Sequence, residues 1–193
     1  IKIYLKKYIN GMELLDNHNL KNDILNKNNN LYIFGAGHVS AALMNKLDGI
    51  DFNVFVIDSR EEYLSKIKLE YINTILAKNP EIIIKNAPSN AYYLIMTHSH
   101  QIDLSICSLL LKKKDYQFIG LIGSKTKKAR FSKKLKELGH KEDQINNIEC
   151  PIGIDEISGK EPDVIAISII ARLLQFKSLI ESNKKSYIKL IKG

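Results

Sequence analysis

The sequence predicts an α/β fold in which a mostly parallel, doubly wound sheet lies between two layers of helices. Short apolar runs alternate with longer segments in which apolar residues recur every three or four positions. The short runs lack polar alternation, which is typical of strands buried on both faces. A chain of 193 residues with 45% hydrophobic content is long enough for one core of this kind.

The first part of the chain is expected to lie outside this fold. Residues 1–30 are rich in Asn and Lys and end in a polar run that is typical of a linker. We therefore expect residues 1–30 to form a short N-terminal extension or remnant, with at most one short helix. Residues 31–193 are expected to form one cofactor-binding domain.

The apolar runs predict five strands. They are expected at residues 31–34, 52–57, 92–97 and 118–122, with a weaker strand at either 72–76 or 82–84. Because connections between parallel strands are right-handed, this pattern favours the strand order 3-2-1-4-5. In such a sheet, ligands bind beyond the carboxyl ends of the strands.

Four helices are predicted from periodic apolar residues. Their inward faces are expected at Val39, Leu43 and Leu47; at Ile102, Ile106, Leu109 and Leu110; at Phe131, Leu135 and Leu138; and at Ile167, Ala171 and Leu174. The second should end at Lys112–Lys114, since lysines offset the helix dipole there. The third should stop at Gly139 and the fourth should begin at Pro162.

A glycine turn follows the first strand and opens the first helix. In the run Gly35-Ala36-Gly37-His38, the first glycine permits a tight turn and the second lets a phosphate approach the backbone. The free N–H groups of the helix start favour an anion. Asp58 follows Gly37 by about 20 residues, the position at which Rossmann folds bind a ribose hydroxyl. The pattern predicts a Rossmann-type site for a phosphate-bearing cofactor; a turn kept only for packing is the alternative.

Arg60 follows the second strand and has two interpretations. It would contact a 2′-phosphate of a dinucleotide, or it would pair with Glu61 or Glu62 on the surface. The sequence leaves both open.

Polar residues also follow the fourth strand. Thr97, His98 and His100 are expected at its carboxyl end, where the histidines would contact a cofactor or transfer protons near neutral pH. Ser99 is expected to cap the next helix. A metal site would need further converging ligands, and none is expected.

The fifth strand leads into a basic helix. Gly123, Ser124 and Lys125 predict a second phosphate site, with Ser124 as the helix cap. The dense cluster Lys125, Lys127, Lys128 and Arg130 opposes the helix dipole, which a bound anion would compensate. A basic helix that is merely solvated is the alternative.

Two cysteines occur in the chain, which rules out a disulfide scaffold. Cys107 lies in an apolar run and is expected in the core. Cys150 begins the run Cys150-Pro151-Ile152-Gly153, which is expected to be a loop between two helices. It would present its thiol to a cofactor or serve as a structural cysteine.

The net charge of +8 is compatible with nucleic acid, a membrane surface or small anions as ligands. The sequence has no RNA-binding aromatic signature and no zinc-finger spacing, so we expect no nucleic-acid partner. It has no apolar stretch of about 18 residues and no secretory leader, so we expect a cytoplasmic protein without a membrane partner.

Several separate motifs, in order, resemble one known family. They are residues 35–39, 56–61, 96–103, 119–125, 150–153 and 161–166. Together they resemble the C-terminal domain of the xanthine dehydrogenase accessory factor family (XdhC/CoxI), over about residues 31–178. Three positions depart from it: residues 1–30 contain no cysteine motif, Ser40 replaces a usual glycine or alanine, and Arg172 replaces a common acidic residue.

The resemblance implies a maturation factor for molybdenum hydroxylases of the xanthine dehydrogenase type. Such a factor binds the molybdenum cofactor, as molybdopterin or a dinucleotide form, supports its sulfuration by a cysteine desulfurase, and delivers it to the apoenzyme. It is more a carrier or chaperone than a catalyst, and we expect a homo-oligomer. The cofactor contacts are expected at Gly35, Gly37, His38, Asp58, Arg60, Thr97, His98, His100, Gly123, Ser124, Lys125 and Cys150.

A second hypothesis comes from another class of protein. The same glycine turn and Asp58 would suit an NAD(P)-dependent oxidoreductase. No Tyr-x-x-x-Lys pair follows Tyr4, Tyr63 or Tyr71, so the typical catalytic pair of one such class is missing at those positions.

For the maturation-factor hypothesis, the absence of cysteines in residues 1–30 would leave sulfur handling to a separate subunit.

Overall fold

The computed structural model describes residues 29–192, with side chains described for residues 29–183. The expected N-terminal extension therefore lies almost wholly outside the described residues. Within residues 29–192, no helix is both long enough and apolar enough to cross a lipid bilayer.

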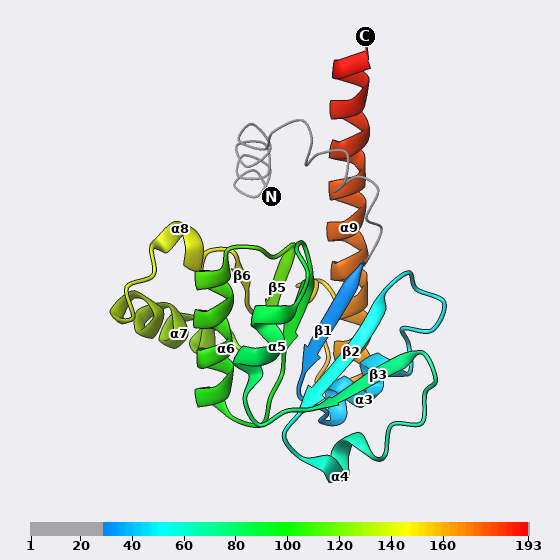
Figure 1. Cartoon of the computed structure of the whole chain (residues 1–193), viewed down its shortest axis with the longest axis vertical. Helices are drawn as coiled ribbons and strands as arrows, with labels where there is room; N and C mark the ends of the chain where they lie inside the picture. The colour runs from blue at the N-terminus through cyan, green and yellow to red at the C-terminus, as the bar shows by residue number, and fades with distance from the viewer. Residues whose placement is uncertain (1–28, 193) are drawn as a thin grey trace.

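The centre of the fold is a parallel sheet of six strands in the order β3-β2-β1-β4-β5-β6 (Figure 1). The strands are β1 Asn30–Phe34, β2 Asn53–Asp58, β3 Ile72–Leu76, β4 Tyr92–Ile95, β5 Phe118–Leu121 and β6 Ile148–Glu149. The predicted order of the first five strands is confirmed. The weaker strand lies at 72–76, whereas residues 82–84 belong to a helix.

Helices cover both faces of the sheet. They are α3 His38–Met44, α4 Glu61–Leu64, α5 Pro80–Asn86, α6 His100–Lys113, α7 Lys125–Glu137, α8 Glu142–Ile145 and α9 Pro162–Lys192. Helices α3 and α9 pack on one face, while α5, α6 and α7 pack on the other. The doubly wound, three-layer architecture predicted from the sequence is confirmed.

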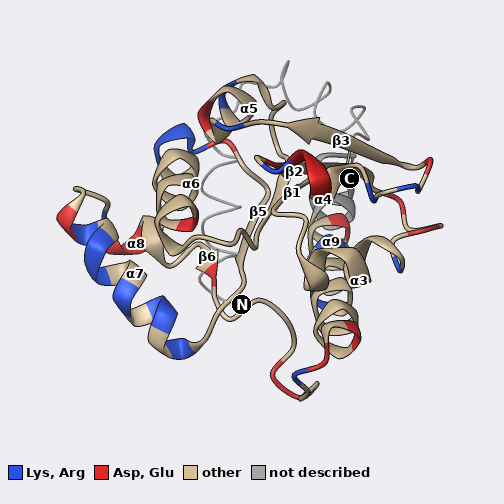
Figure 2. Ribbon diagram, turned by 90° about the horizontal axis from the view of Figure 1, so that it is seen from below, with Lys and Arg blue, Asp and Glu red and all other residues tan. Residues whose placement is uncertain are grey.

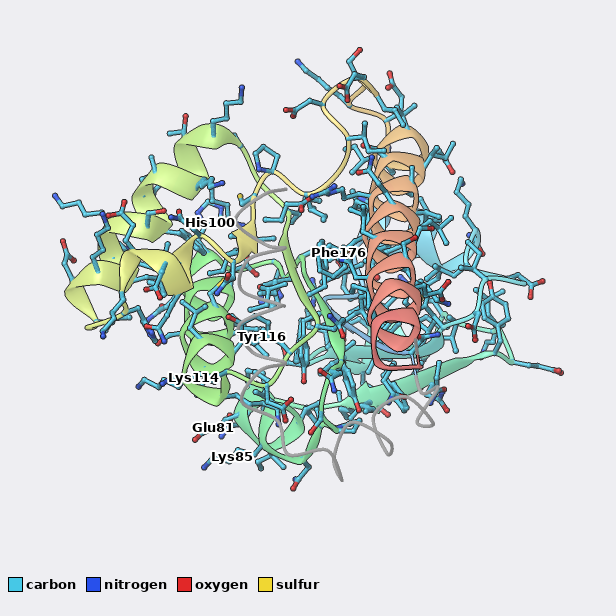
Figure 3. The ribbon with its side chains drawn as sticks, turned by 90° about the horizontal axis from the view of Figure 1, so that it is seen from above. Glu81, Lys85, His100, Lys114, Tyr116 and Phe176 are labelled. Carbon is cyan, nitrogen blue, oxygen red and sulfur yellow. The ribbon has the colours of Figure 1, made fainter. Side chains whose placement is uncertain are left out.

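Helix α9 turns a different face to the core than its periodicity predicted. Ala166, Ile169, Ile170 and Leu173 are buried, whereas Ile167 and Leu174 are 49% and 40% exposed. The inward face predicted from Ile167, Ala171 and Leu174 was therefore wrong. Two apolar stripes run side by side along this helix, and spacing alone does not select between them. Contact with the sheet selects the inward stripe, since Phe176, labelled on α9 in Figure 3, has its ring centroid 4.9 Å from that of Phe118 in β5.

Helix α7 shows a smaller deviation of the same kind. Phe131 and Leu135 are buried as predicted, but Leu138 is 56% exposed. Leu138 follows the last helical residue, and the chain turns away there at Gly139, whose φ is +86°. The predicted helix end at Gly139 is therefore confirmed, while Leu138 is no part of the core.

Candidate functional site

Five of the motifs predicted from the sequence lie at the ends of strands and meet at one edge of the sheet. Gly35 follows β1, Asp58 ends β2, Thr97 follows β4, Gly123 follows β5 and Cys150 follows β6. Because the strands are parallel, their carboxyl ends lie at the same edge, which Figure 2 views from below. We call this the cofactor edge. The crossover between β1 and β4, where ligands bind in doubly wound sheets, lies at its centre.

Gly35 permits the close approach of the β1 turn to the end of β4. Its φ is +108°, and a Cβ at this position would lie 2.3 Å from the carbonyl oxygen of Met96. Its own N–H donates to the carbonyl of Ile57 at 2.7 Å. The turn is thus held between the neighbouring strands, and a side chain at Gly35 is incompatible with this packing.

Gly37, unlike Gly35, has free space where a side chain would begin. It caps α3 without a side-chain hydrogen bond, and nothing lies within 4 Å of a Cβ built on it. The start of α3 has no acidic residue in its first turn. Ser40, at the third position of the motif, is 1% exposed, so this small side chain keeps the helix close to the sheet. Its hydroxyl has no hydrogen-bond partner among the described residues.

Asp58 is fully engaged by its surroundings. The side chain is 2% exposed and accepts four hydrogen bonds: from the N–H of Ala36 at 2.8 Å, and from the backbone N–H, Nε and Nη2 of Arg60 at 3.0, 2.9 and 2.7 Å. A carboxylate has about four acceptor positions, so those of Asp58 are filled. Arg60 pairs with Asp58 and not with Glu61 or Glu62, which corrects the surface pairing considered above. Its guanidinium also lies 3.8 Å above the ring of Tyr63.

This arrangement makes the stability of the domain depend on pH. Burial alone raises the pKa of Asp58, but the hydrogen bonds from Arg60 and Ala36 and the charge of Arg60 outweigh it and lower the pKa to about 2. A lowered pKa stabilises the fold above the ordinary value of 3.8, and this contribution is lost as the pH falls from there through 2. We expect the loss to be about 2 kcal/mol.

Urea unfolding between pH 5 and 2 measures this contribution when Asp58→Asn is compared with the wild-type protein. The variant keeps an acceptor but does not titrate, so its free energy of unfolding should fall less steeply below pH 4. Equal slopes for the two proteins would contradict the role given to Asp58.

The loop after β4 is organised by a buried carboxylate, Asp103 on α6. Asp103 is 0% exposed and accepts hydrogen bonds from the N–H and the hydroxyl of Thr97 at 3.1 and 2.6 Å. The hydroxyl of Thr97 in turn accepts from the N–H of Ser99 at 3.2 Å. Ser99 caps α6 as predicted, since its hydroxyl accepts from the N–H of Ile102. The hydrogen bonds of Thr97 therefore hold the backbone of this loop in place.

Lys127 joins this loop to the one after β5. Its ammonium donates to Asp103 Oδ2 at 2.6 Å and to the carbonyl of Ile122 at 2.8 Å. A Cβ on Gly123 would lie 2.5 Å from Lys127 Cδ, so Gly123 makes room for the buried lysine chain. Lys127 is 9% exposed and belongs to this ion pair, not to an anion site as the basic cluster suggested. The sequence did indicate this burial, because Lys127 lies four residues before the buried Phe131 and therefore on the same face of the helix.

The start of α7 fits the remaining part of the predicted second anion site. Ser124 caps the helix, with its hydroxyl accepting from the N–H of Lys127 at 3.2 Å. Lys125, Lys128 and Arg130 are exposed, and the first turn has no acidic residue. Uncompensated positive charge therefore borders the cofactor edge at β5.

The histidines at the edge are accessible. His38, His98 and His100 are all exposed, and the ring of His100 contacts Phe131 edge-on at 6.4 Å between centroids (Figure 3). Among the described residues, no group of three or more His, Cys, Asp or Glu side chains is placed to hold a metal ion.

Cys150 lies below the surface of the edge. It directly follows β6, a two-residue strand that the sequence analysis missed, so it does not belong to a plain loop between helices. The residue is 3% exposed, its Sγ lies 3.9 Å from the carbonyl oxygen of Ser124, and burial raises the pKa of its thiol. Cys107 is fully buried in the core, as predicted. Both thiols are free.

Arg172 serves the fold. Its Nε and Nη2 donate to the two carboxylate oxygens of Glu149 at 2.6 and 2.7 Å. This bidentate pair fastens α9 to β6 and so supports the strand that directly precedes Cys150. The unusual arginine thus has an intramolecular partner.

Comparison with known proteins agrees with this architecture. A curated relative, the uncharacterized protein YqeB of Escherichia coli (strain K12), is 29% identical over 152 residues, which cover 77% of this chain and 27% of the relative. A crystal structure described as a xanthine dehydrogenase from Bacillus halodurans is also 29% identical, with a TM-score of 0.65 over 78% of this chain and 43% of that chain. The chain thus spans less than half the length of either protein. The family described as XdhC Rossmann domain matches residues 31–173, and since this is most of the sequence, the chain belongs to that family.

Proposed function

We propose that this domain holds the molybdenum cofactor, as molybdopterin or a dinucleotide form, and helps to mature a molybdenum hydroxylase of the xanthine dehydrogenase type. Membership of the XdhC family supports an accessory role in this system. The observation that carries the proposal is the open backbone at Gly37, where nothing lies within 4 Å of an added Cβ at the centre of the cofactor edge. A phosphate approaches the backbone where side chains are absent.

The residues at the edge fit such a ligand. The Gly35–Gly37 turn and the start of α3 would hold one phosphate, and Lys125 and Lys128 would attract a second anionic group. Thr97, His98 and His100 border the same edge and would contact the pterin, which offers hydrogen-bond donors and acceptors. When bound, the group supplies the redox centre of the client enzyme, while this chain binds and orients it.

A carrier role suits the edge better than catalysis of sulfur transfer. The thiol of Cys150 is buried and its pKa is raised, so little thiolate is present near neutral pH. We propose that a cysteine desulfurase supplies sulfur to the bound cofactor and that the apoenzyme then receives it. We further propose that the protein acts in the cytoplasm as a homo-oligomer.

The geometry of Asp58 argues against the oxidoreductase hypothesis. A bound NAD would need this carboxylate for its ribose, yet Arg60 and Ala36 fill its acceptor positions. An NADP phosphate would need Arg60, which is bound to Asp58. Either cofactor would have to displace the pair.

Substitution of Gly37 by Asp tests the proposed site. The new carboxylate would lie where the phosphate binds, and like charges in contact cost several kcal/mol, so we expect at least about a 30-fold loss of cofactor affinity. Asp is a favoured helix N-cap, so the stability of the fold should stay the same or rise. Native mass spectrometry after co-expression with the cofactor biosynthesis enzymes reads the bound mass directly.

The paired measurements separate binding from folding. The thermal unfolding temperature of Gly37→Asp should equal or exceed that of the wild-type protein, while the cofactor mass disappears from its spectrum. Retention of the cofactor by this variant would exclude Gly37 from the site. Calorimetric titration with NAD and NADP provides the second control, and tight binding of either would favour the oxidoreductase.

A further inference from the structure

We propose that the exposed side of α7 is the docking surface for a carboxylate-rich surface of the apoenzyme that receives the cofactor. We define this α7 basic surface by Lys125, Lys128, Arg130, Lys133 and Lys134. The inference rests on the proposed function, because it names where a cofactor carrier meets its client.

The charge of the chain is concentrated on this helix. Seven of the 13 residues of α7 are Lys or Arg, and one, Glu137, is acidic. The helix therefore carries a net charge of +6, out of +8 for the whole chain. Figure 2 shows basic residues along the length of α7, at the periphery of the domain outside α6.

Five of these cations are unpaired within the described residues. Lys127 is turned inward to Asp103, and Lys136 pairs with Glu142. The residues of the α7 basic surface are exposed and take part in no ion pair of the described chain. Clustered like charges repel one another and give the isolated domain no stability. The bound cofactor would neutralise Lys125 and Lys128 at the start of the helix, and carboxylates on a partner would relieve the repulsion among Arg130, Lys133 and Lys134.

The chemistry of the surface favours a protein partner. The aromatic residue of α7, Phe131, is 5% exposed and packs inward, so the helix offers no ring on which a nucleic-acid base would stack. Its exposed side has no apolar stripe that would enter a lipid interface. A contact made by charge alone forms fast and dissociates readily, as a delivery complex requires.

The position of α7 links docking to delivery. Ser124 and Lys125 lie directly after β5 at the cofactor edge, and the helix runs outward from there over 13 residues, or about 20 Å. A partner that lies along α7 would have the cofactor edge at one end of its contact. The same helix would thus attract the client and align it with the bound cofactor.

The charge-reversal variant K133E/K134E tests this proposal. Both residues are exposed and lie outside the proposed cofactor contacts. The matched control is K68E/K78E, which reverses the charge of two exposed lysines flanking β3, the outermost strand on the side of the sheet opposite β6. Each variant changes the net charge by the same amount.

Surface plasmon resonance with cofactor-free hydroxylase, purified from a cofactor-deficient strain of the source organism, measures the association rate constant. We expect K133E/K134E to reduce it about tenfold at low ionic strength, and K68E/K78E to stay close to the wild-type value. The wild-type rate should also fall as salt rises, because salt screens exposed charges.

Equal association rates for the two variants would overturn the proposal. The proposal would also be overturned if the wild-type protein did not bind the apoenzyme but bound duplex DNA or phosphatidylglycerol vesicles, and K133E/K134E weakened that binding. Native mass spectrometry of the same samples separates the two proposals. If the protein retains the cofactor but K133E/K134E associates as fast as the wild-type protein, the docking surface is refuted. If association depends on α7 but no cofactor is bound, the carrier function is refuted.

Discussion

Replacing Lys127 by Met should lower the free energy of unfolding by about 3–5 kcal/mol, the usual cost of removing one partner from a buried ion pair. Asp103 is 0% exposed and would lose its buried partner, the ammonium now 2.6 Å away. The carbonyl of Ile122 would also lose a donor. Urea unfolding at neutral pH measures this loss.

Two further variants show whether the buried charge is responsible. Lys136→Met removes an exposed pair with Glu142, and should change the stability by less than about 1 kcal/mol. The double variant D103N/K127M removes both charges but keeps an oxygen for Thr97, so it should recover much of the loss of Lys127→Met. A double variant no more stable than Lys127→Met would mean that charge is not the cause.

Replacing Gly35 by Ala should cost about 2–6 kcal/mol, which combines the strain of an unfavourable φ with that of overpacking. The added Cβ would meet the backbone of Met96 at 2.3 Å, and this backbone directly follows β4, where its N–H donates to the carbonyl of Phe34 at 2.9 Å. Unlike a flexible side chain, it has little freedom to move. Thermal or urea unfolding measures the effect, and the cofactor edge should be lost with it.

Two other glycines separate the contributions. Gly49 has a φ of +73° but nothing within 4 Å of an added Cβ, so Gly49→Ala reports on the backbone conformation alone. Gly37→Ala has neither a positive φ nor a clash, and should cost less than about 1 kcal/mol. If Gly35→Ala were no worse than Gly49→Ala, the close approach to Met96 would not limit this position.

The sequence predicted the features that depend on local pattern. Buried strands read as continuous apolar runs, and glycines and serines at strand ends marked the turn at Gly35 and the caps at Ser99 and Ser124. These signals are local because each depends on a few neighbouring residues. Parallel strands then gather their carboxyl ends at one edge whatever the loops contain.

Features that depend on tertiary contacts escaped prediction. In the sequence, Lys127 could not be told apart from its exposed neighbours, and only the fold places Asp103 of α6 beside it. Arg60 pairs with Asp58, two residues before it, and not with Glu61 or Glu62. The inward face of α9 was misassigned because two apolar stripes compete on it. Strand β6 was missed because two residues are too few to show any periodicity.

The cofactor edge has two halves, each built around one buried carboxylate. Asp58 fixes the β1 turn to the end of β2, and Asp103 fixes the loop after β4 to the loop after β5. The halves meet where Gly35 packs on Met96. Such an edge is already ordered before any ligand arrives, so association would forfeit little chain entropy, and most of the contact energy would remain available as affinity.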